Sequence, residues 1–178
     1  MCEMALPDFF YSTDVHTHRR GPGLITSVEP GEDTTGAERL SVGVHPWHAD
    51  TGDVAAVRRM ALDDPRVVAI GECGLDRFRG PSLEVQQRVF EQQIRLSEEL
   101  GLPLIIHCVR AFAELIALRL KYKSAQPWII HGFRGKPELA AQLVRHGFYL
   151  SLGRLHNLAV PGTVPPERLL HETDSPSV

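Results

Sequence analysis

The sequence lacks the features that mark membrane, secreted and disulfide-stabilised proteins. None of its apolar runs approaches the roughly 20 residues that a helix needs to span a bilayer. The N-terminal stretch MCEMALPDFF has two acidic and no basic residues, unlike a secretory signal. Three cysteines without CxxC spacing favour a reducing compartment over a disulfide scaffold. These absences predict a cytoplasmic protein with no membrane partner.

Neither sign of charge dominates the composition. Nineteen Lys and Arg residues against 22 Asp and Glu residues give a net charge of −3, which excludes a globally basic nucleic-acid binder but allows a local basic groove. Hydrophobic residues at 43% and charged residues at 23% exclude disorder and coiled coil. A length of 178 residues suits one domain, so we expect residues 1–178 to form a single domain. The unusual feature is the presence of nine histidines.

Short apolar runs that end in polar or glycine-rich turns recur along the whole chain. Runs such as VVAI, LII and WII lack polar alternation, as do strands that are buried on both faces of a parallel sheet. Eight runs of this kind predict eight strands, over residues 9–15, 24–28, 40–44, 67–71, 104–106, 128–130, 148–152 and 169–172.

Helical patterns separate the later strands. The clearest covers residues 82–100, where Ser82 is suited to cap the first turn. Residues 111–123 place Phe112 and Leu120 on one apolar stripe. Two more helices are predicted over residues 53–63 and 136–146.

Alternating strands and helices predict an α/β fold, and eight strands favour a TIM-type (β/α)8 barrel. We expect a distorted, trimmed barrel that lacks some outer helices, including the C-terminal one. Residues 19–23 are fewer than the dozen or more of a usual parallel crossover. The last strand ends close to the C-terminus, so no following helix would cover Leu169 and Leu170. Another segment or a second copy should cover them, and a symmetric homodimer is predicted.

Histidine and carboxylate side chains follow six of the eight predicted strands. The C-terminal ends of parallel barrel strands share one mouth, so these side chains should meet there. Neutral imidazoles together with carboxylates are ligands for a divalent ion. The residues are His16, His18, His45, Glu72, His107, His131 and Asp174.

The spacing of these residues suggests a site for two ions. His16 and His18 point to the same face of an extended strand and can bind one ion together. Glu72 has two oxygens and can bridge to a second ion, while Asp174 can complete the first shell and take a proton from water. Two ions roughly 3.5–4 Å apart clamp the attacking and leaving oxygens of a hydrolysis. Glu72 and Asp174 are therefore the predicted catalytic residues. The second ion would lie against Glu72, His107 and His131.

Six segments occur in one order over nearly the whole chain: DVHTH, GVHPWH, AIGECGLD, PLIIHC, IIHGFRG and ETDSP. In these segments the sequence resembles the TatD family of metal-dependent hydrolases. The resemblance implies a distorted TIM barrel with two divalent ions and deoxyribonuclease activity. Magnesium would be the functional ion, and zinc, manganese or nickel could bind as well. It implies one ion at His16, His18, Glu72 and Asp174, and the other at Glu72, His107 and His131. It also implies that substrate phosphate lies near His45 and Arg134.

The chain departs from the family pattern near the mouth. Arg77 and Phe78 stand where an aromatic pair often follows GLD. The arginine that usually comes two residues after the fifth-strand histidine is replaced by Val109, with Arg110 one place later. These departures leave the predicted metal ligands intact and change the substrate groove.

The leading functional prediction is a phosphodiesterase that cleaves DNA. Arginine pairs well with phosphate oxygens, and seven arginines fall in or near the predicted mouth loops: Arg19, Arg20, Arg77, Arg79, Arg110, Arg134 and Arg154. No aromatic-rich stacking platform is visible, so we do not expect sequence-specific recognition. Two alternatives stay open. The same barrel could hydrolyse an amide or ester bond of a small molecule, or it could bind metal without catalysis.

Overall fold

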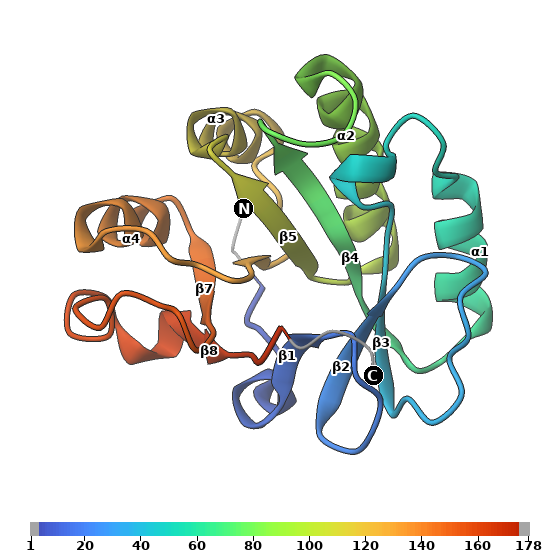
Figure 1. The fold of residues 1–178 in the computed structure, drawn as a ribbon, viewed down its shortest axis with the longest axis horizontal. Helices are drawn as coiled ribbons and strands as arrows, with labels where there is room; N and C mark the ends of the chain where they lie inside the picture. Colours follow the sequence, from blue (N-terminus) through green and yellow to red (C-terminus); the bar gives the residue numbers. More distant parts are fainter. Residues whose placement is uncertain (1–3, 175–178) are drawn as a thin grey trace.

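Eight parallel strands, each hydrogen-bonded to the next in chain order, curve around a common axis in the computed structural model, which describes residues 4–174 (Figure 1). The strands are β1 (Asp14–Thr17), β2 (Leu24–Val28), β3 (Arg39–Val42), β4 (Val67–Asp76), β5 (Leu104–Val109), β6 (Trp128–Ile130), β7 (Phe148–Leu152) and β8 (Leu169–His171). The helices are α1 (Val54–Asp63), α2 (Leu83–Leu100), α3 (Phe112–Tyr122) and α4 (Pro137–Arg145). Three short 3-10 helices are η1 (Asp8–Ser12), η2 (Pro46–His48) and η3 (Pro166–Arg168).

The segment after β8 returns to β1 and nearly closes the barrel. The backbone N–H and the hydroxyl of Thr173 donate to the Asp14 carboxylate at 3.1 and 2.6 Å. The N–H of Asp174 donates to the carbonyl of His16 at 3.1 Å. The fold is therefore a trimmed TIM barrel, as predicted. Its α-helices lie only between β3 and β7, and none follows β8 within the described residues.

Side-chain alternation along the strands produces two apolar layers. Ile105 of β5 and Ile129 of β6 point inward and pack in the barrel interior with Tyr149. Their neighbours Leu104 and Trp128 point outward and pack under the helices, against residues such as Phe90 and Ile94 of α2. His107 and His131 lie two residues beyond Ile105 and Ile129, so the same alternation turns their side chains inward at the mouth.

The four predicted helices are confirmed, with bounds that differ by one residue at most at each end. The Ser82 hydroxyl caps α2 by accepting from the N–H of Val85 at 3.4 Å. One detail was wrong. Leu120, expected on the apolar stripe of α3, is 56% exposed, whereas the neighbouring Arg119 is buried over the ring of Trp128.

The first predicted strand, over residues 9–15, is only partly correct. Asp8–Ser12 form η1, and β1 begins at Asp14. The N–H of Phe10 donates to the carbonyl of Pro7 at 3.0 Å and closes a tight turn. This turn places the Phe10 ring, which is 0% exposed, among the interior side chains. Burial of one large ring thus overrides the extended pattern of the sequence.

The short link between the first two strands does not prevent parallel pairing. Asp14 of β1 lies beside Leu24 of β2, and the two strands run in the same direction. Since β1 has four residues, its length is about 13 Å. Residues 18–23, which form bends and a turn, are long enough to return the chain over this distance without a helix.

The apolar surface expected around the last strand is covered by the chain itself. Leu170 is 5% exposed and packs with Leu6 and Phe10 in the barrel interior. Leu169 is half-buried against the outer layer. The reason given for a homodimer is therefore wrong, and dimerisation stays a prediction. None of the described helices has the length and apolar character that crossing a membrane requires.

A stability test follows from the role of Phe10 in the barrel interior. Replacement of a fully buried Phe by Ala costs about 3–5 kcal/mol, so Phe10→Ala should lower the free energy of unfolding by that amount. Phe78 is 72% exposed, and Phe78→Ala should change the free energy of unfolding by less than about 0.5 kcal/mol. Urea unfolding followed by circular dichroism measures both. A loss below about 1 kcal/mol for Phe10→Ala would show that η1 contributes little to the core.

Candidate metal centre

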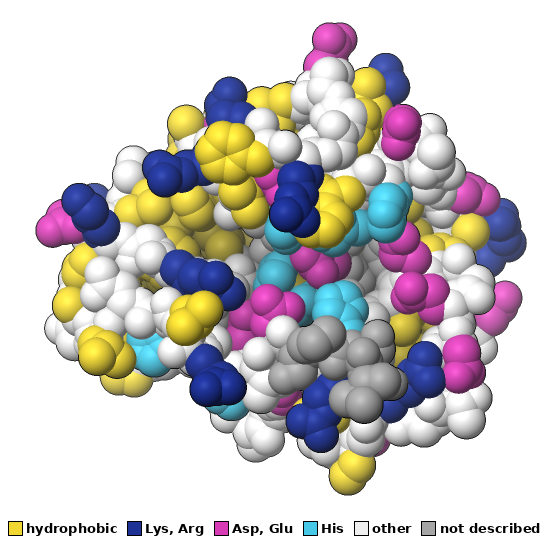
Figure 2. Space-filling model, viewed as in Figure 1, with side chains coloured by type: hydrophobic (Ala, Val, Ile, Leu, Met, Phe, Trp, Pro, Cys, Tyr) yellow, Lys and Arg dark blue, Asp and Glu magenta, His cyan; other side chains and the backbone are white. Residues whose placement is uncertain are grey.

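The seven histidine and carboxylate residues singled out in the sequence come together at the mouth formed by the carboxyl ends of the strands. Figure 2 shows this mouth as a central hollow, where histidine and acidic side chains gather. Glu72 and His107 lie within β4 and β5, because both strands continue past their predicted ends. The others stand in β1 or just after a strand: His16, His18, His45, His131 and Asp174.

Two glycines allow β4 and β5 to approach each other closely around Glu72. A Cβ atom on Gly71 would lie 2.3 Å from the carbonyl oxygen of Ile105, and one on Gly74 would lie 2.1 Å from that of His107. Both glycines also have positive φ angles, 151° and 134°. Any larger residue would push the strands apart. The GECG segment thus brings the Glu72 carboxylate within reach of His107.

The Glu72 carboxylate is the common partner of four histidines. Its Oε2 lies 3.3 Å from Nε2 of His16. Burial alone would raise the pKa of Glu72, but His131 and His16 beside it hold the pKa well below its ordinary value. Glu72 is therefore an ionised carboxylate that is only 7% exposed. Its Oε1 lies 2.8 Å from His107 Nδ1, 2.9 Å from His131 Nε2 and 3.0 Å from His45 Nε2.

His16 and His131 are the most deeply buried of these histidines. Burial lowers the pKa of His16, and the neighbouring His131 lowers it further, so His16 is a neutral imidazole. Burial also acts against a charge on His131, but Glu72 outweighs it and raises the pKa of His131 well above its usual value. Neutral imidazole is the form that binds a metal ion, and an ion beside Glu72 would replace the proton on His131.

The donor atoms fit divalent ions. Neither ring nitrogen of His16 makes a hydrogen bond within the described part of the chain, although both are buried. Buried polar atoms without such partners are costly. Imidazole and carboxylate donors suit ions of the first transition row and magnesium. Three sets of donor atoms each lie within 4.8 Å of one another: His16, His18 and Glu72; His16, His131 and Asp174; and His45, Glu72 and His107.

Two further carboxylates support the histidines from behind, and the sequence analysis assigned them no role. Asp76 Oδ2 lies 3.1 Å from Nε2 of His107 and accepts from Nε1 of Trp47 at 2.7 Å. Glu172 is fully buried, and its Oε1 lies 3.7 Å from Nδ1 of His131. An outer carboxylate within hydrogen-bond distance of a ligating histidine, as Asp76 is of His107, fixes the orientation and tautomer of the ring. The signal for these two carboxylates in the sequence was an even spacing from a predicted ligand. Asp76 lies four residues after Glu72, and Glu172 lies two residues before Asp174.

Glu29 is another functional candidate that no motif singled out. Its Oε1 accepts from the N–H of His45 at 2.8 Å, and its Oε2 lies 2.7 Å from Nδ1 of His48. This carboxylate fixes the loop that carries His45. Because the contact joins loops after β2 and β3, no local pattern in the sequence indicates it.

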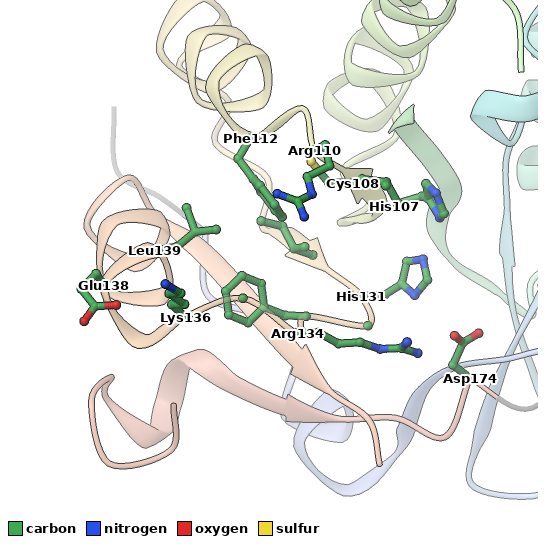
Figure 3. Close-up of a pocket in the computed structure, with 15 residues that line it drawn as sticks. His107, Cys108, Arg110, Phe112, His131, Arg134, Lys136, Glu138, Leu139 and Asp174 are labelled. Carbon is green, nitrogen blue, oxygen red and sulfur yellow. The ribbon is translucent and has the colours of Figure 1, made fainter. Parts of the chain in front are cut away.

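Five of the seven predicted phosphate-binding arginines divide into two groups. Arg20 pairs with Asp33 at 3.0 Å, and Arg77 pairs with Glu114. Arg110 and Arg134 instead line a cavity of about 800 Å³ that begins at His107, His131 and Asp174 (Figure 3). Arg154 lies in a neighbouring pocket that also contains Arg134 and Asp174. Of the two residues expected beside substrate phosphate, Arg134 faces this cavity and His45 contacts Glu72 directly.

Fold and site together define a class: α/β barrels whose mouth carries a histidine and carboxylate cluster suited to divalent ions. The family model described as TatD related DNase matches residues 28–178. This chain belongs to that family.

Individual relatives agree with this assignment. The chain is 38% identical over 169 residues to the 3'-5' ssDNA/RNA exonuclease TatD of Cronobacter sakazakii, with 85% of this chain and 64% of that protein covered. It is 34% identical over 151 residues to the enzyme of the same name from Escherichia coli K12, with 76% and 57% covered. The chain therefore spans less than two thirds of either relative.

Solved structures show the same fold. The TatD homologue YJJV from Escherichia coli K12 has a TM-score of 0.71 and 25% identity, with 85% of this chain and 66% of that chain covered. A TatD family hydrolase from Entamoeba histolytica also has a TM-score of 0.71, at 23% identity, with 85% and 60% covered.

The contact between Asp76 and His107 gives a test of the outer carboxylates. Asp76→Asn keeps the shape but removes the charge that holds His107, so metal affinity should fall roughly 10–100-fold. Calorimetric titration of EDTA-treated protein with Mn²⁺ measures it. Asp33→Asn removes an exposed carboxylate paired with Arg20 and should leave the affinity within about twofold. Equal affinities for the two variants would mean that Asp76 does not support a metal ligand.

Proposed function

We propose that this chain is a two-metal hydrolase of phosphodiester bonds that cleaves DNA or other nucleic acid. The observation that carries the proposal is the Glu72 carboxylate, which histidines approach from opposite sides at a mouth that also presents Arg110 and Arg134, neither of which forms an ion pair with a residue of the described range 4–174. Relatives named 3'-5' ssDNA/RNA exonucleases support it. Free thiols at Cys73 and Cys108 support the cytoplasm as the location.

The proposed ligands keep the two sets expected from the sequence, with Glu72 shared between the ions. When bound, two divalent ions would neutralise charge on the phosphate and activate the attacking water. We propose magnesium as the functional ion, while zinc, manganese or nickel could bind the same donors. One ion would be held by His16, His18, Glu72 and Asp174, and the other by Glu72, His107 and His131.

Asp174 is the proposed proton acceptor. Burial alone would raise the pKa of Asp174, but the His16 ring, whose Nε2 lies 3.5 Å from its Oδ1, and the positive charge of His131 hold the pKa below its usual value. The carboxylate is therefore ionised, and it is still partly exposed at the edge of the cavity. A group in this position can take the proton of the attacking water.

Two side chains are proposed to position the scissile phosphate. The Arg134 side chain extends toward Asp174 in Figure 3, where its guanidinium would meet phosphate oxygens. His45 lies beside Glu72 and His107 and would contact the phosphate from the opposite side. Both residues orient the substrate, and neither carries the proton transfer.

The alternative of a non-catalytic scaffold is less well supported. That alternative assumed that the metal ligands would be poorly held without a helix after the last strand. The contacts of Thr173 with Asp14 and of Asp174 with His16 hold the last ligand at the mouth. Hydrolysis of a small amide or ester would not need the cations that line the cavity.

Substitution of Glu72 tests the shared ligand. Glu72→Gln keeps the shape but removes the charge, so it should lose bound metal and at least 10²–10³ of the turnover of bis-p-nitrophenyl phosphate. EDTA should abolish the wild-type activity, and Mg²⁺ should restore it. Glu84→Gln, an exposed change on α2, is the matched control and should retain full activity. Activity of Glu72→Gln within about tenfold of wild type, or turnover of amides and lactones instead, would contradict the proposal.

A further inference from the structure

The cavity beside the metal centre extends well beyond the residues that the chemistry needs. It has a volume of about 800 Å³, within the range of small-ligand pockets. One end is formed by His107, His131 and Asp174, and its walls come from the segments that join β5 to α3 and β6 to α4 (Figure 3). Figure 2 shows a hollow with hydrophobic side chains in its floor and basic side chains around it.

Cations stand on both walls of this cavity. Arg110 comes from the segment after β5, and Arg134 and Lys136 come from the segment after β6. All three are exposed, and none of their side chains forms an ion pair with a residue of the described range 4–174. Glu138 is the acidic residue on the same wall. The walls therefore carry a net positive charge that suits a phosphate backbone.

The backbone of Arg110 is held in an uncommon conformation. Its φ angle is 57°, in the left-handed region that residues other than glycine rarely adopt. Arg77 holds it there, since its Nε donates to the carbonyl of Arg110 at 2.9 Å while its guanidinium pairs with Glu114. Asp174 also has a positive φ, of 45°. Such conformations cluster at functional sites, because surrounding contacts must maintain them.

The remaining wall is apolar and partly aromatic. Phe112, at the start of α3, is half-buried and packs edge-to-face against Phe133, with 6.2 Å between ring centroids. Leu139 of α4 and Val109 lie in the same wall. An aromatic ring next to phosphate-binding cations is the arrangement by which proteins bind unpaired bases.

We propose that this cavity, the nucleotide cavity, binds one unpaired nucleotide next to the cleaved bond, with its base against Phe112 and its outer phosphate against Arg110, while Arg134 holds the scissile phosphate. The inference rests on the proposed function and assigns Phe112 and Arg110 of this chain to the binding of the nucleotide. A base can enter the cavity only if it is unpaired, which agrees with the single-stranded substrates in the names of the relatives.

Binding without cleavage tests the cationic walls. A fluorescein-labelled oligothymidylate is titrated in EDTA, and its anisotropy is followed at several salt concentrations. Arg110→Gln and Arg134→Gln should each raise Kd about tenfold and should lower the slope of log K against log salt by about 0.7. Arg88→Gln, an exposed change on α2, removes the same charge and should leave Kd within about twofold. A duplex of the same length should bind more weakly than the single strand.

An abasic series tests the aromatic wall. One abasic residue is moved along the oligonucleotide, and at one position the wild-type Kd should rise about tenfold, because the contact with Phe112 is lost. Phe112→Leu should bind the intact oligonucleotide with this raised Kd. An abasic residue at the same position should change the Kd of the variant by less than about twofold. Phe78→Leu, a change at an exposed ring that lies outside the cavity lining, should keep the wild-type pattern.

The outcomes separate this inference from the proposed function. Failure of the wild type to turn over bis-p-nitrophenyl phosphate would refute the hydrolase, and the EDTA titration would still decide on the cavity. The inference is overturned if the wild type binds no oligonucleotide, if Arg110→Gln binds like Arg88→Gln, or if the abasic residue weakens Phe112→Leu as much as wild type. If Phe112→Leu does not fold, the arginine variants and the abasic series on wild type give the answer.

Discussion

The buried negative charge of Glu72 is the constraint on which the mouth of the barrel depends. An ionised carboxylate that is 7% exposed is stable only when hydrogen-bond donors or cations surround it. Histidines from the β3, β5 and β6 sides of the mouth supply them at 2.8–3.0 Å, and His16 from the β1 side lies 3.3 Å away. These strands must therefore converge on β4, and the same contacts that compensate the charge assemble the donor set for metal ions. The Glu72 carboxylate and the ring nitrogens around it therefore both stabilise the mouth and form the candidate metal centre.

Support for this cluster comes from a second layer of carboxylates. Asp76, Glu172 and Glu29 each contact a histidine or its backbone from the side away from Glu72. Thr173 anchors the segment that carries Glu172 through its bonds to Asp14. The closing contact between β8 and β1 therefore also positions the last donors. A site of this kind does not need a complete ring of outer helices, because side chains at the mouth hold the strand ends together.

The proposed chemistry and the proposed substrate binding meet in the nucleotide cavity, whose inner end consists of the proposed metal ligands. His131 and Asp174 face the metal centre on one side and the cavity on the other. A phosphate that Arg134 holds at this boundary would reach both the metal centre and the cavity. The departure of this chain from the family pattern, Arg110 after Val109, falls on the wall of the same cavity.

The sequence by itself determined the order of strands and helices, the barrel class and the seven side chains at the mouth. These follow from local rules: side-chain period, capping residues such as Ser82, and the shared direction of parallel strand ends. Tertiary structure decided the rest. The 3-10 helix around Phe10, the cover over Leu170 and the contact of Glu29 with His45 all depend on side chains distant in sequence. No local pattern reveals which of them meet, because burial and charge compensation are settled only when the barrel closes.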